Sequence, residues 1–323
     1  MKAIVQDEYG SPDVLELREI DKPVVKDDEV LVRVRAASVN PADWHYLRGV
    51  PYIMRPVSGL GKPKNAVLGR DIAGEVEELG KGVTRFVAGD DVFANVESGG
   101  FAEYAAVPEA VLVPKPANLT FEQAAAVPLA ALTALQGLRD AGKLQPAQKV
   151  SIIGASGGVG TFAVQIAKSF GADVTGVCST RNVELVRLLG ADDVIDYTQE
   201  DFTQSGQKYD LILQLAGTRS PSDCRRALTS KGTLLLSSGE SRGRWIGPVG
   251  RMIKAAALSP FVSQKLGSFL AKSDQDDLQF VKELIEAGKV KPVIDRTYPL
   301  SETPEAISYL EEGHSRGKVV ITM

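Results

Sequence analysis

The sequence predicts an α/β protein with two parts, a small β-barrel or sandwich and a parallel sheet flanked by helices. Three observations support this prediction. Short runs with strand periodicity, separated by glycine-rich turns, fill the first third of the chain. From residue 149 onward, short β-branched runs alternate with helical segments, which is the pattern of βαβ units around a parallel sheet. The length of 323 residues also exceeds the usual size of one domain.

Strands are predicted for four segments of the N-terminal part. Residues 29–34 alternate apolar and polar side chains, the period of a half-buried strand, and similar runs occupy 72–76, 92–95 and 101–107. Thr120, followed by Gln123 three residues later, forms a capping-box pattern that begins an alanine-rich helix, which Pro128 interrupts.

The middle of the chain is predicted to alternate strand and helix. The expected strands are 150–153, 174–177, 194–197, 211–215 and 233–237, and the expected helices are 158–170 and 183–189. In the tail we expect helices at 276–288 and 304–313 and strands at 293–298 and 318–322. Because the termini of a chain tend to lie on one domain, we expect the tail to return to the N-terminal part.

Composition excludes several classes of protein. The 37 Lys and Arg against 41 Asp and Glu give a net charge of −4, so no basic field is present to bind nucleic acid. Two cysteines indicate a reducing compartment and exclude both a disulfide framework and a Cys₄ zinc site. No secretory signal and no stretch long enough to cross a membrane is visible, so we expect a cytoplasmic protein.

A glycine-rich turn carries the clearest functional signal. Gly154, Gly157 and Gly160 recur every third residue between a predicted strand and a predicted helix. Residues without a Cβ let the backbone approach a pyrophosphate, which the N–H groups at the start of the helix then bind. The turn therefore predicts a dinucleotide site. An ordinary glycine-rich connection is the alternative.

The end of the next strand indicates which nicotinamide cofactor binds. NAD-specific sites place a carboxylate there for the ribose 2′-hydroxyl. This chain instead has Ser179, Thr180 and Arg181, and a guanidinium suits the 2′-phosphate of NADP. NADP is therefore the predicted cofactor. Alternatively, Arg181 is a solvated charge near a helix start.

The chain resembles the medium-chain dehydrogenase/reductases and, within them, the zinc-independent quinone oxidoreductases. The resemblance rests on segments that span nearly the whole chain in the family's order, namely 37–44, 68–74, 83–90, 100–104, 126–137, 154–160, 194–197 and 313–321. It implies a GroES-like catalytic domain of the β-barrel type from residues 1–122 and 266–323. It also implies a Rossmann domain, a doubly wound parallel sheet, from residues 123–265, and a homodimer.

The resemblance also implies that no zinc is bound. Zinc-dependent members of the family use a Cys, a Gly-His-Glu motif and a second Cys. Here Ser38 lies near the first ligand position, Gly69-Arg70-Asp71 replaces the motif, and 128–133 contains no Cys. Without a Lewis acid, the expected reaction is NADPH-dependent hydride transfer to a quinone, an enal or an enone. The alternatives are a zinc-free NADP-dependent alcohol dehydrogenase or carbonyl reductase, and a non-catalytic NADPH-binding redox sensor.

Site residues follow from the same resemblance. Thr133 and Asn40 would flank the nicotinamide, and Arg316 and Lys318 would close over the cofactor. The alternative for Asn40 is a turn residue before Pro41. The residues expected around the pyrophosphate are Ser156, Gly157, Gly158 and Val159, and those expected around the 2′-phosphate are Ser179, Arg181 and Tyr197. Related reductases place a Lys shortly after the Ser, where this chain has Asn182, so Arg181 would substitute for it.

The proton donor has two candidates, His45 and Tyr46, which are counted with Asn40 as catalytic. His45 is the better acid near neutral pH, with an ordinary pKa of about 6.5. Solvent could also deliver the proton. Two irregular segments, 50–64 and 242–270, are expected to shape the substrate pocket. For 242–270, a membrane-surface helix and a packed helix with solvated basic residues are the alternatives.

Overall fold

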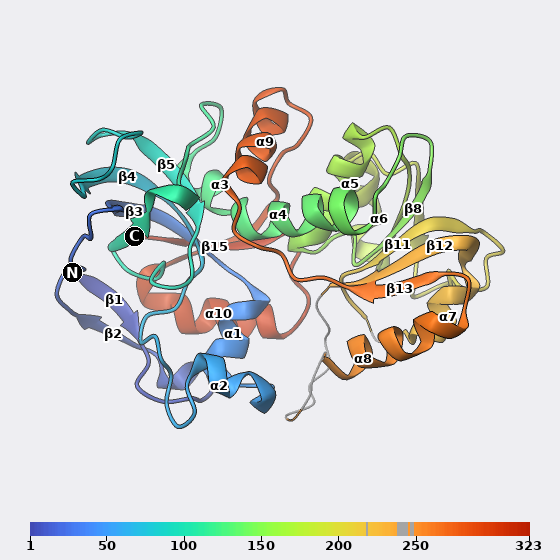
Figure 1. Ribbon diagram of the computed structural model, residues 1–323, viewed down its shortest axis with the longest axis horizontal. Coiled ribbons are helices and arrows are strands. Elements are labelled where there is room, and N and C mark those ends of the chain that lie inside the picture. Colours follow the sequence, from blue (N-terminus) through green and yellow to red (C-terminus); the bar gives the residue numbers. More distant parts are fainter. Residues whose placement is uncertain (218, 238–244, 246–248) are drawn as a thin grey trace. The chain divides into compact units, whose positions relative to one another are not determined.

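The computed structural model describes residues 1–217, 219–237, 245 and 249–323 (Figure 1). The chain divides into two compact units. Unit 1 comprises Met1–Leu132, Ser273–Gly288 and Pro292–Met323, and unit 2 comprises Thr133–Lys272 and Lys289–Lys291. The predicted boundaries at 122/123 and 265/266 fall before these transitions. The first differs because helix α3 (Phe121–Ala125) packs on the sheet of unit 1, and the second because strand β13 (Lys265–Ser268) belongs to the sheet of unit 2.

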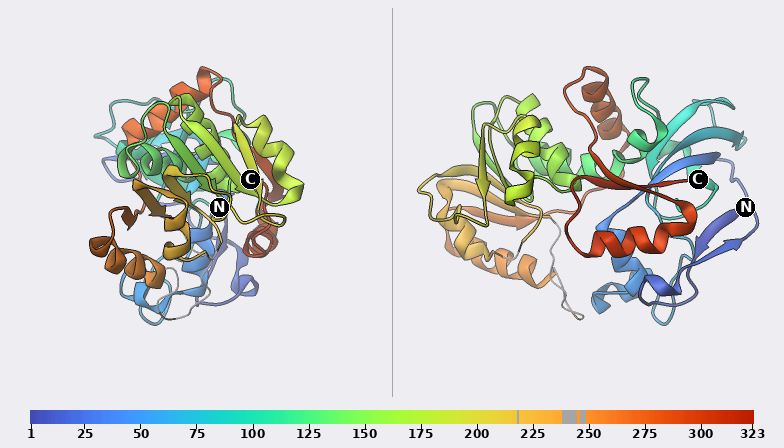
Figure 2. Two further views of the ribbon diagram at one scale, coloured as in Figure 1. Left: turned by 90° about the vertical axis from the view of Figure 1, so that its right-hand side faces the viewer. Right: turned by 180° about the vertical axis from the view of Figure 1, so that it is seen from behind.

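The sheet of unit 1 is built around a long strand, β3 (Glu29–Val39). β3 pairs antiparallel with β4 (Asp71–Leu79), β6 (Tyr104–Pro108) and β15 (Lys318–Thr322). Val319 lies opposite Val39, so the tail of the chain returns to this sheet. Figure 2 shows β15 and the helix before it, in red, beside the blue strands of the same unit. The remaining strands of unit 1 are β1 (Lys2–Val5), β2 (Glu16–Glu19), β5 (Asp91–Asn95), β7 (Val113–Pro114) and β14 (Ile294–Pro299).

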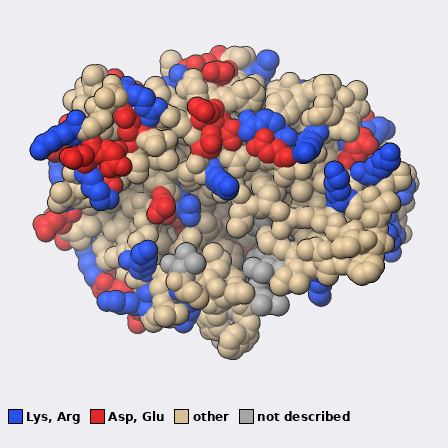
Figure 3. Space-filling view, viewed as in Figure 1, with Lys and Arg blue, Asp and Glu red and all other residues tan. Residues whose placement is uncertain are grey.

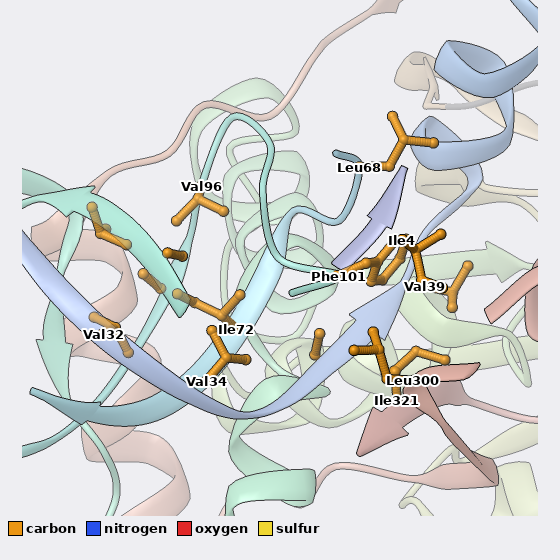
Figure 4. Packing of buried hydrophobic residues seen from close by; sticks show 14 of the residues in the cluster. Ile4, Val32, Val34, Val39, Leu68, Ile72, Val96, Phe101, Leu300 and Ile321 are labelled. Atoms are coloured by element: carbon orange, nitrogen blue, oxygen red, sulfur yellow. The ribbon is translucent and has the colours of Figure 1, made fainter. Parts of the chain in front are cut away.

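Burial of apolar side chains holds unit 1 together. Figure 4 shows side chains from separate elements meeting in one cluster, among them Ile4, Val34, Ile72, Phe101 and Ile321. All of these are nearly inaccessible to solvent, so each contributes on the order of 1.5–3 kcal/mol to stability by leaving water.

The helices of unit 1 begin where the sequence supplies caps. The Thr120 side chain accepts the N–H of Gln123, and the Gln123 side chain accepts the N–H of Thr120, which confirms the predicted capping box. Helix α1 (Pro41–Arg48) follows β3 directly, with Asn40 as its N-cap and Pro41 as its first residue. The other helices are α2 (Arg55–Ser58), α4 (Pro128–Gln136), which crosses the boundary, α9 (Gln275–Glu286) and α10 (Thr303–Glu311).

Unit 2 is a doubly wound parallel sheet with strand order β10-β9-β8-β11-β12-β13. Figure 1 shows α5 and α6 on one side of it and α7 and α8 on the other. The chain reverses its winding direction between β8 and β11, which is where sheets of this kind bind ligands. The elements are β8 (Lys149–Ile153), α5 (Gly158–Ser169), β9 (Asp173–Cys178), α6 (Val183–Leu188), β10 (Asp193–Asp196), β11 (Tyr209–Gln214), α7 (Pro221–Arg226), β12 (Leu228–Leu236), α8 (Val249–Leu258) and β13.

The segment 242–270 lies only partly within the described residues, and Arg242 and Arg244 lie outside them. Its described part forms α8 and β13. Ala255 on α8 is fully buried in the core of unit 2, whereas Ile253 is exposed. β13 escaped prediction because it is short and contains Gly267 in place of a β-branched residue. Within the described ranges, none of the helices combines the length and the apolar composition that crossing a bilayer requires.

In the upper and left parts of the face drawn in Figure 3, charges of both signs lie close to one another, whereas much of the lower right part carries neither. Surface ion pairs such as Lys22–Glu77 and Lys168–Asp192, each with an N–O distance of 2.7 Å, join such charges. A surface of mixed sign creates no extended field that would attract a polyanion.

Candidate active site

The three glycines of the turn between β8 and α5 differ in their surroundings. Gly154 has φ of +87°, and a Cβ there would lie 2.7 Å from the Cβ of Ala216. A Cβ on Gly160 would lie 2.0 Å from the carbonyl oxygen of Gly154. Both positions therefore require glycine. At Gly157, the N-cap of α5, an added Cβ would find its nearest neighbour 3.5 Å away, so the space beside the turn is open to a ligand.

The residues predicted to hold a pyrophosphate lie at this open place. Ser156 and Gly157 precede α5, and Gly158 and Val159 form its first turn. The first N–H groups of a helix have no acceptor within the helix, and the helix dipole adds positive potential. The geometry and the donors fit a dinucleotide pyrophosphate.

The residues predicted around a 2′-phosphate meet at the carboxyl end of β9. The N–H of Tyr197 donates to the carbonyl of Cys178 over 3.0 Å, which brings Tyr197 beside Ser179. Tyr197 is 60% exposed, and Arg181 is also exposed, so both side chains are accessible.

Asn182 links the two halves of this site. Its amide donates to Ser156 Oγ over 2.9 Å and to Ser179 Oγ over 3.3 Å. Its Oδ1 is buried and has no hydrogen-bond partner among the described residues. In the sequence, Asn182 is noted only because related reductases place a Lys at this position. In the structure it connects the glycine turn to the end of β9.

A carboxylate of the neighbouring strand also lies near this end of β9. Asp196, the last residue of β10, lies opposite Cys178 in the parallel register. Its carboxylate accepts the hydroxyl of Thr180 over 2.6 Å and the hydroxyl of Thr198 over 2.7 Å. The bond from Thr180 holds the pKa of Asp196 below its usual value, so the group is ionised at neutral pH. The spacing along β9 gives no sign of this carboxylate, because it comes from the neighbouring strand.

In unit 1 a buried polar cluster surrounds Asp71, the first residue of β4, which is fully buried. The groups that donate to its carboxylate are Ser38 Oγ (3.1 Å), Asn40 Nδ2 (2.9 Å), Lys318 Nζ (3.2 Å), Asn95 Nδ2 (3.0 Å) and the N–H of Leu129 (2.9 Å). A buried carboxylate needs such partners, because an unpaired charge in the interior is very unfavourable.

Asn40 and Lys318 lie inside this cluster, and each is only 3% exposed. The ammonium of Lys318 donates to Asn40 Oδ1 over 2.5 Å. The amide of Asn40 donates to Asp71 and, over 3.3 Å, to the carbonyl of Ser38. The prediction that Lys318 closes over a cofactor does not agree with this burial, because its charge already neutralises Asp71.

Thr133 and Arg316 are the remaining residues predicted to contact the cofactor. Thr133 is the first residue of unit 2, within α4, and is 8% exposed. Arg316 is exposed, and its N–H donates to Asp295 over 2.9 Å.

His45 and Tyr46 lie on α1 and line a small cavity with Gly49, Val50 and Met54. The Nδ1 of His45 lies 2.9 Å from the carbonyl of Val50, and its ring stacks on Trp44 with centroids 3.6 Å apart. Burial lowers the pKa of His45, so the ring is mostly neutral at pH 7 and Nδ1–H is the group that donates to Val50. Less of His45 is therefore in the protonated form that can act as an acid near neutral pH than its ordinary pKa suggests.

Asp43, which is not among the predicted site residues, is almost fully buried on α1. One oxygen accepts the N–H of Asn40 over 2.8 Å, and the other has no partner among the described residues. Burial raises its pKa to about 7, and the charge of Asp71 adds to this effect, while Arg70 and Lys318 oppose it.

The residues that replace a zinc-ligand set do not fit a metal ion. Both oxygens of Asp71 already accept hydrogen bonds, and Lys318 neutralises its charge. No group of three or more His, Cys, Asp or Glu side chains in the described part of the chain is arranged to hold a metal.

Comparison with known proteins places the chain among oxidoreductases. Residues 26–117 match the family model described as the alcohol dehydrogenase GroES-like domain, and residues 189–321 match the model described as zinc-binding dehydrogenase. The chain is 36% identical to an NADPH-dependent alkenal/one oxidoreductase of Arabidopsis thaliana, over 99% of this chain and 79% of that protein. It is 34% identical to the chloroplast envelope quinone oxidoreductase homolog of the same plant, over 99% and 98%.

Similarity in structure points the same way. The structure of the quinone oxidoreductase from Coxiella burnetii superimposes with a TM-score of 0.88 at 29% identity, covering 100% of this chain and 99% of that one. Unit 1 has the GroES-like fold and unit 2 the Rossmann-type parallel sheet that the sequence predicted. With these relatives and this fold, the chain belongs to the medium-chain dehydrogenase/reductase family.

Proposed function

We propose that this protein transfers a hydride from NADPH to a quinone or to an α,β-unsaturated carbonyl compound, without a metal ion. The observation that carries the proposal is the site in unit 2, where an open glycine turn and an accessible arginine follow consecutive strands of a parallel sheet. The names of the relatives, alkenal/one and quinone oxidoreductases, favour these acceptors.

Different residues of unit 2 would bind different parts of the cofactor. NADPH, when bound, supplies the hydride. The N–H groups at the start of α5, beside Ser156 and Gly157, would hold its pyrophosphate. Arg181 and Tyr197 would bind the 2′-phosphate, and Asp196 opposes that charge from the neighbouring strand. The preference for NADPH over NADH therefore depends on two opposing effects. Arg181 attracts the 2′-phosphate and Asp196 repels it.

The buried cluster of unit 1 supports the absence of zinc from the reaction. A divalent ion at Asp71 would have to displace Lys318 and the hydrogen bonds that the carboxylate accepts. An acceptor that is already electrophilic needs no Lewis acid, because the nicotinamide can reduce it directly once both are positioned. The final proton can come from solvent or from Tyr46, since His45 is mostly neutral at pH 7.

The test is an assay of nicotinamide absorbance with NADPH or NADH and a panel of quinones, enals, enones and saturated aldehydes. We expect NADPH-dependent reduction of quinones or of enals and enones. Reduction of saturated aldehydes alone would favour a zinc-free carbonyl reductase. Tight NADPH binding without turnover of any acceptor would favour a redox sensor.

We also propose a cytoplasmic homodimer. β13 is the edge of the parallel sheet, and the neighbouring Phe261 and Leu270 are more than 80% exposed, so this edge is a candidate for pairing with a second copy. Cys178 and Cys224 are free and buried, in keeping with a reducing compartment. Light scattering after size-exclusion chromatography tests the dimer, and a monomer at all concentrations would contradict it.

A further inference from the structure

Arg70 occupies a fixed place in unit 1, directly before β4. Its carbonyl oxygen accepts the N–H of Val96 over 2.6 Å and the amide of Asn95 over 3.2 Å. The preceding Gly69 has φ of +94°, and a Cβ there would lie 2.6 Å from the nitrogen of Phe101. The backbone that carries the Arg70 side chain is therefore held on both sides.

The side chain of Arg70, in contrast, makes no hydrogen bond or ion pair with any described residue. It is half-buried, and its Nε is buried without an acceptor. Its guanidinium carbon lies 5.9 Å from the centre of the Tyr46 ring. Other arginines of this protein find acceptors: Arg48 makes two bonds to Glu311, and Arg251 makes two bonds to backbone carbonyls.

A guanidinium carries five N–H donors and a permanent charge. Burying such a donor without an acceptor is unfavourable, and the cost is recovered when a ligand supplies an oxygen. Asp43, the carboxyl whose pKa responds to Arg70, forms no ion pair with it and holds the N–H of Asn40 instead. Arg70 is thus an unsatisfied cation beside Tyr46, one of the predicted catalytic residues.

We propose that Arg70 binds the carbonyl oxygen of the substrate and stabilises the oxyanion that forms on this oxygen during reduction. The proposal rests on the proposed function and adds the residue that receives the negative charge. Groups positioned where charge develops stabilise the transition state more than the ground state.

The electron balance is simple for both acceptor classes. Hydride adds to the β-carbon of an enone, the pair of the C=C bond moves into a new C=C bond to the carbonyl carbon, and the carbonyl pair moves onto oxygen as an enolate. A proton from solvent then adds at the α-carbon. For a quinone, the same hydride gives a hydroquinone anion, which takes its proton on oxygen. In both cases NADPH is oxidised to NADP⁺, and Arg70 pairs with the oxyanion.

The direct test uses 4-nitrophenol, because its phenolate resembles a hydroquinone anion and its absorbance reports ionisation. The wild-type protein and the variants Arg70→Gln and Arg70→Lys are titrated with this probe, with and without NADP⁺. Arg35→Gln is the control, since Arg35 pairs with Glu75 on the surface. We expect the wild type and the control to bind the phenolate in preference to the phenol. Arg70→Gln should weaken phenolate binding at least about tenfold, and Arg70→Lys should weaken it less.

Two further measurements separate the roles that Arg70 could have. The Kd of NADPH should stay within about twofold of wild type in Arg70→Gln, while kcat for an enone should fall by roughly 10²-fold with little change in KM. The denaturant midpoint should change little, because the buried Nε of Arg70 has no hydrogen bond to lose among the described residues and the guanidinium lies 5.9 Å from the centre of the Tyr46 ring.

The outcomes decide between this proposal and the proposed function. A wild type without preference for the phenolate, or an Arg70→Gln variant that binds it equally well, overturns the role of Arg70. A large loss of NADPH affinity in Arg70→Gln also overturns it, since Arg70 would then bind a cofactor phosphate. If phenolate binding depends on Arg70 but no quinone or enone is reduced, the oxyanion site stands and the proposed reaction fails.

Discussion

Replacing Lys318 with methionine tests the buried cluster of unit 1 most directly. The change removes the ammonium that lies 2.5 Å from Asn40 Oδ1 and 3.2 Å from Asp71 Oδ2, and it keeps most of the side-chain volume. Asp71 is then a fully buried carboxylate without a cation. Removing one partner of a buried ion pair costs about 3–5 kcal/mol, and we expect the free energy of unfolding of unit 1 to fall by that amount.

A second variant separates charge from packing. Asp71→Asn combined with Lys318→Met removes both charges, and the Asn40 amide can turn so that its oxygen accepts from the new amide at position 71. We expect the double variant to recover about 2 kcal/mol or more of the loss. Lys22→Met is the matched control, because its ion pair with Glu77 is exposed and should contribute far less to stability than a buried pair.

Urea titration followed by tryptophan fluorescence measures these changes. Trp44 lies on α1, next to the cluster, whereas Trp245 is 75% exposed and so responds less to unfolding. The reasoning is refuted if Lys318→Met costs less than about 1 kcal/mol, or if the double variant is no more stable than Lys318→Met.

Four other predictions concern the cofactor, pH and metal. Arg181→Glu should raise the Kd of NADPH roughly 10–100-fold and that of NADH much less, because a contact to the 2′-phosphate becomes repulsive; equal changes would contradict the assignment. Asp196→Asn should tighten NADPH binding several-fold relative to NADH, because it removes an anion near that phosphate; isothermal titration measures both. Asp43 binds its proton more tightly in the folded state, where its pKa is about 7, than in the unfolded state, where the ordinary value is 3.8. The free energy of unfolding should therefore fall as the pH rises from about 4 to 7. Asp43→Asn should remove up to roughly 4 kcal/mol of this pH dependence in urea titrations, whereas Asp27→Asn, on the surface, should not. Elemental analysis should find no stoichiometric zinc, and activity that is lost with a chelator and restored by zinc would contradict a metal-free reaction.

The cofactor turn could be predicted from sequence because its requirements are local. Gly154 needs a positive φ and Gly160 a close backbone contact, and both needs are met within one strand, one turn and one helix. Most strands of unit 2 could be predicted for the same reason, because short runs of β-branched residues or leucines mark them. β13 could not be predicted in this way, because it is a strand through its pairing with β12 and not through its composition.

The sequence by itself determined the two-part α/β architecture, the glycine turn between a strand and a helix, and the family, because these depend on periodicity and on short motifs. Only the tertiary structure decided the surroundings of individual charges. Lys318 and Asn40 are 278 residues apart and meet because β15 pairs with β3. Asp196 reaches Thr180 through the register of two parallel strands, and Arg70 is left without an acceptor among the described residues by the packing around it. A charged side chain has its effect through the atoms within a few ångströms of it, and in this protein those atoms come from distant parts of the chain.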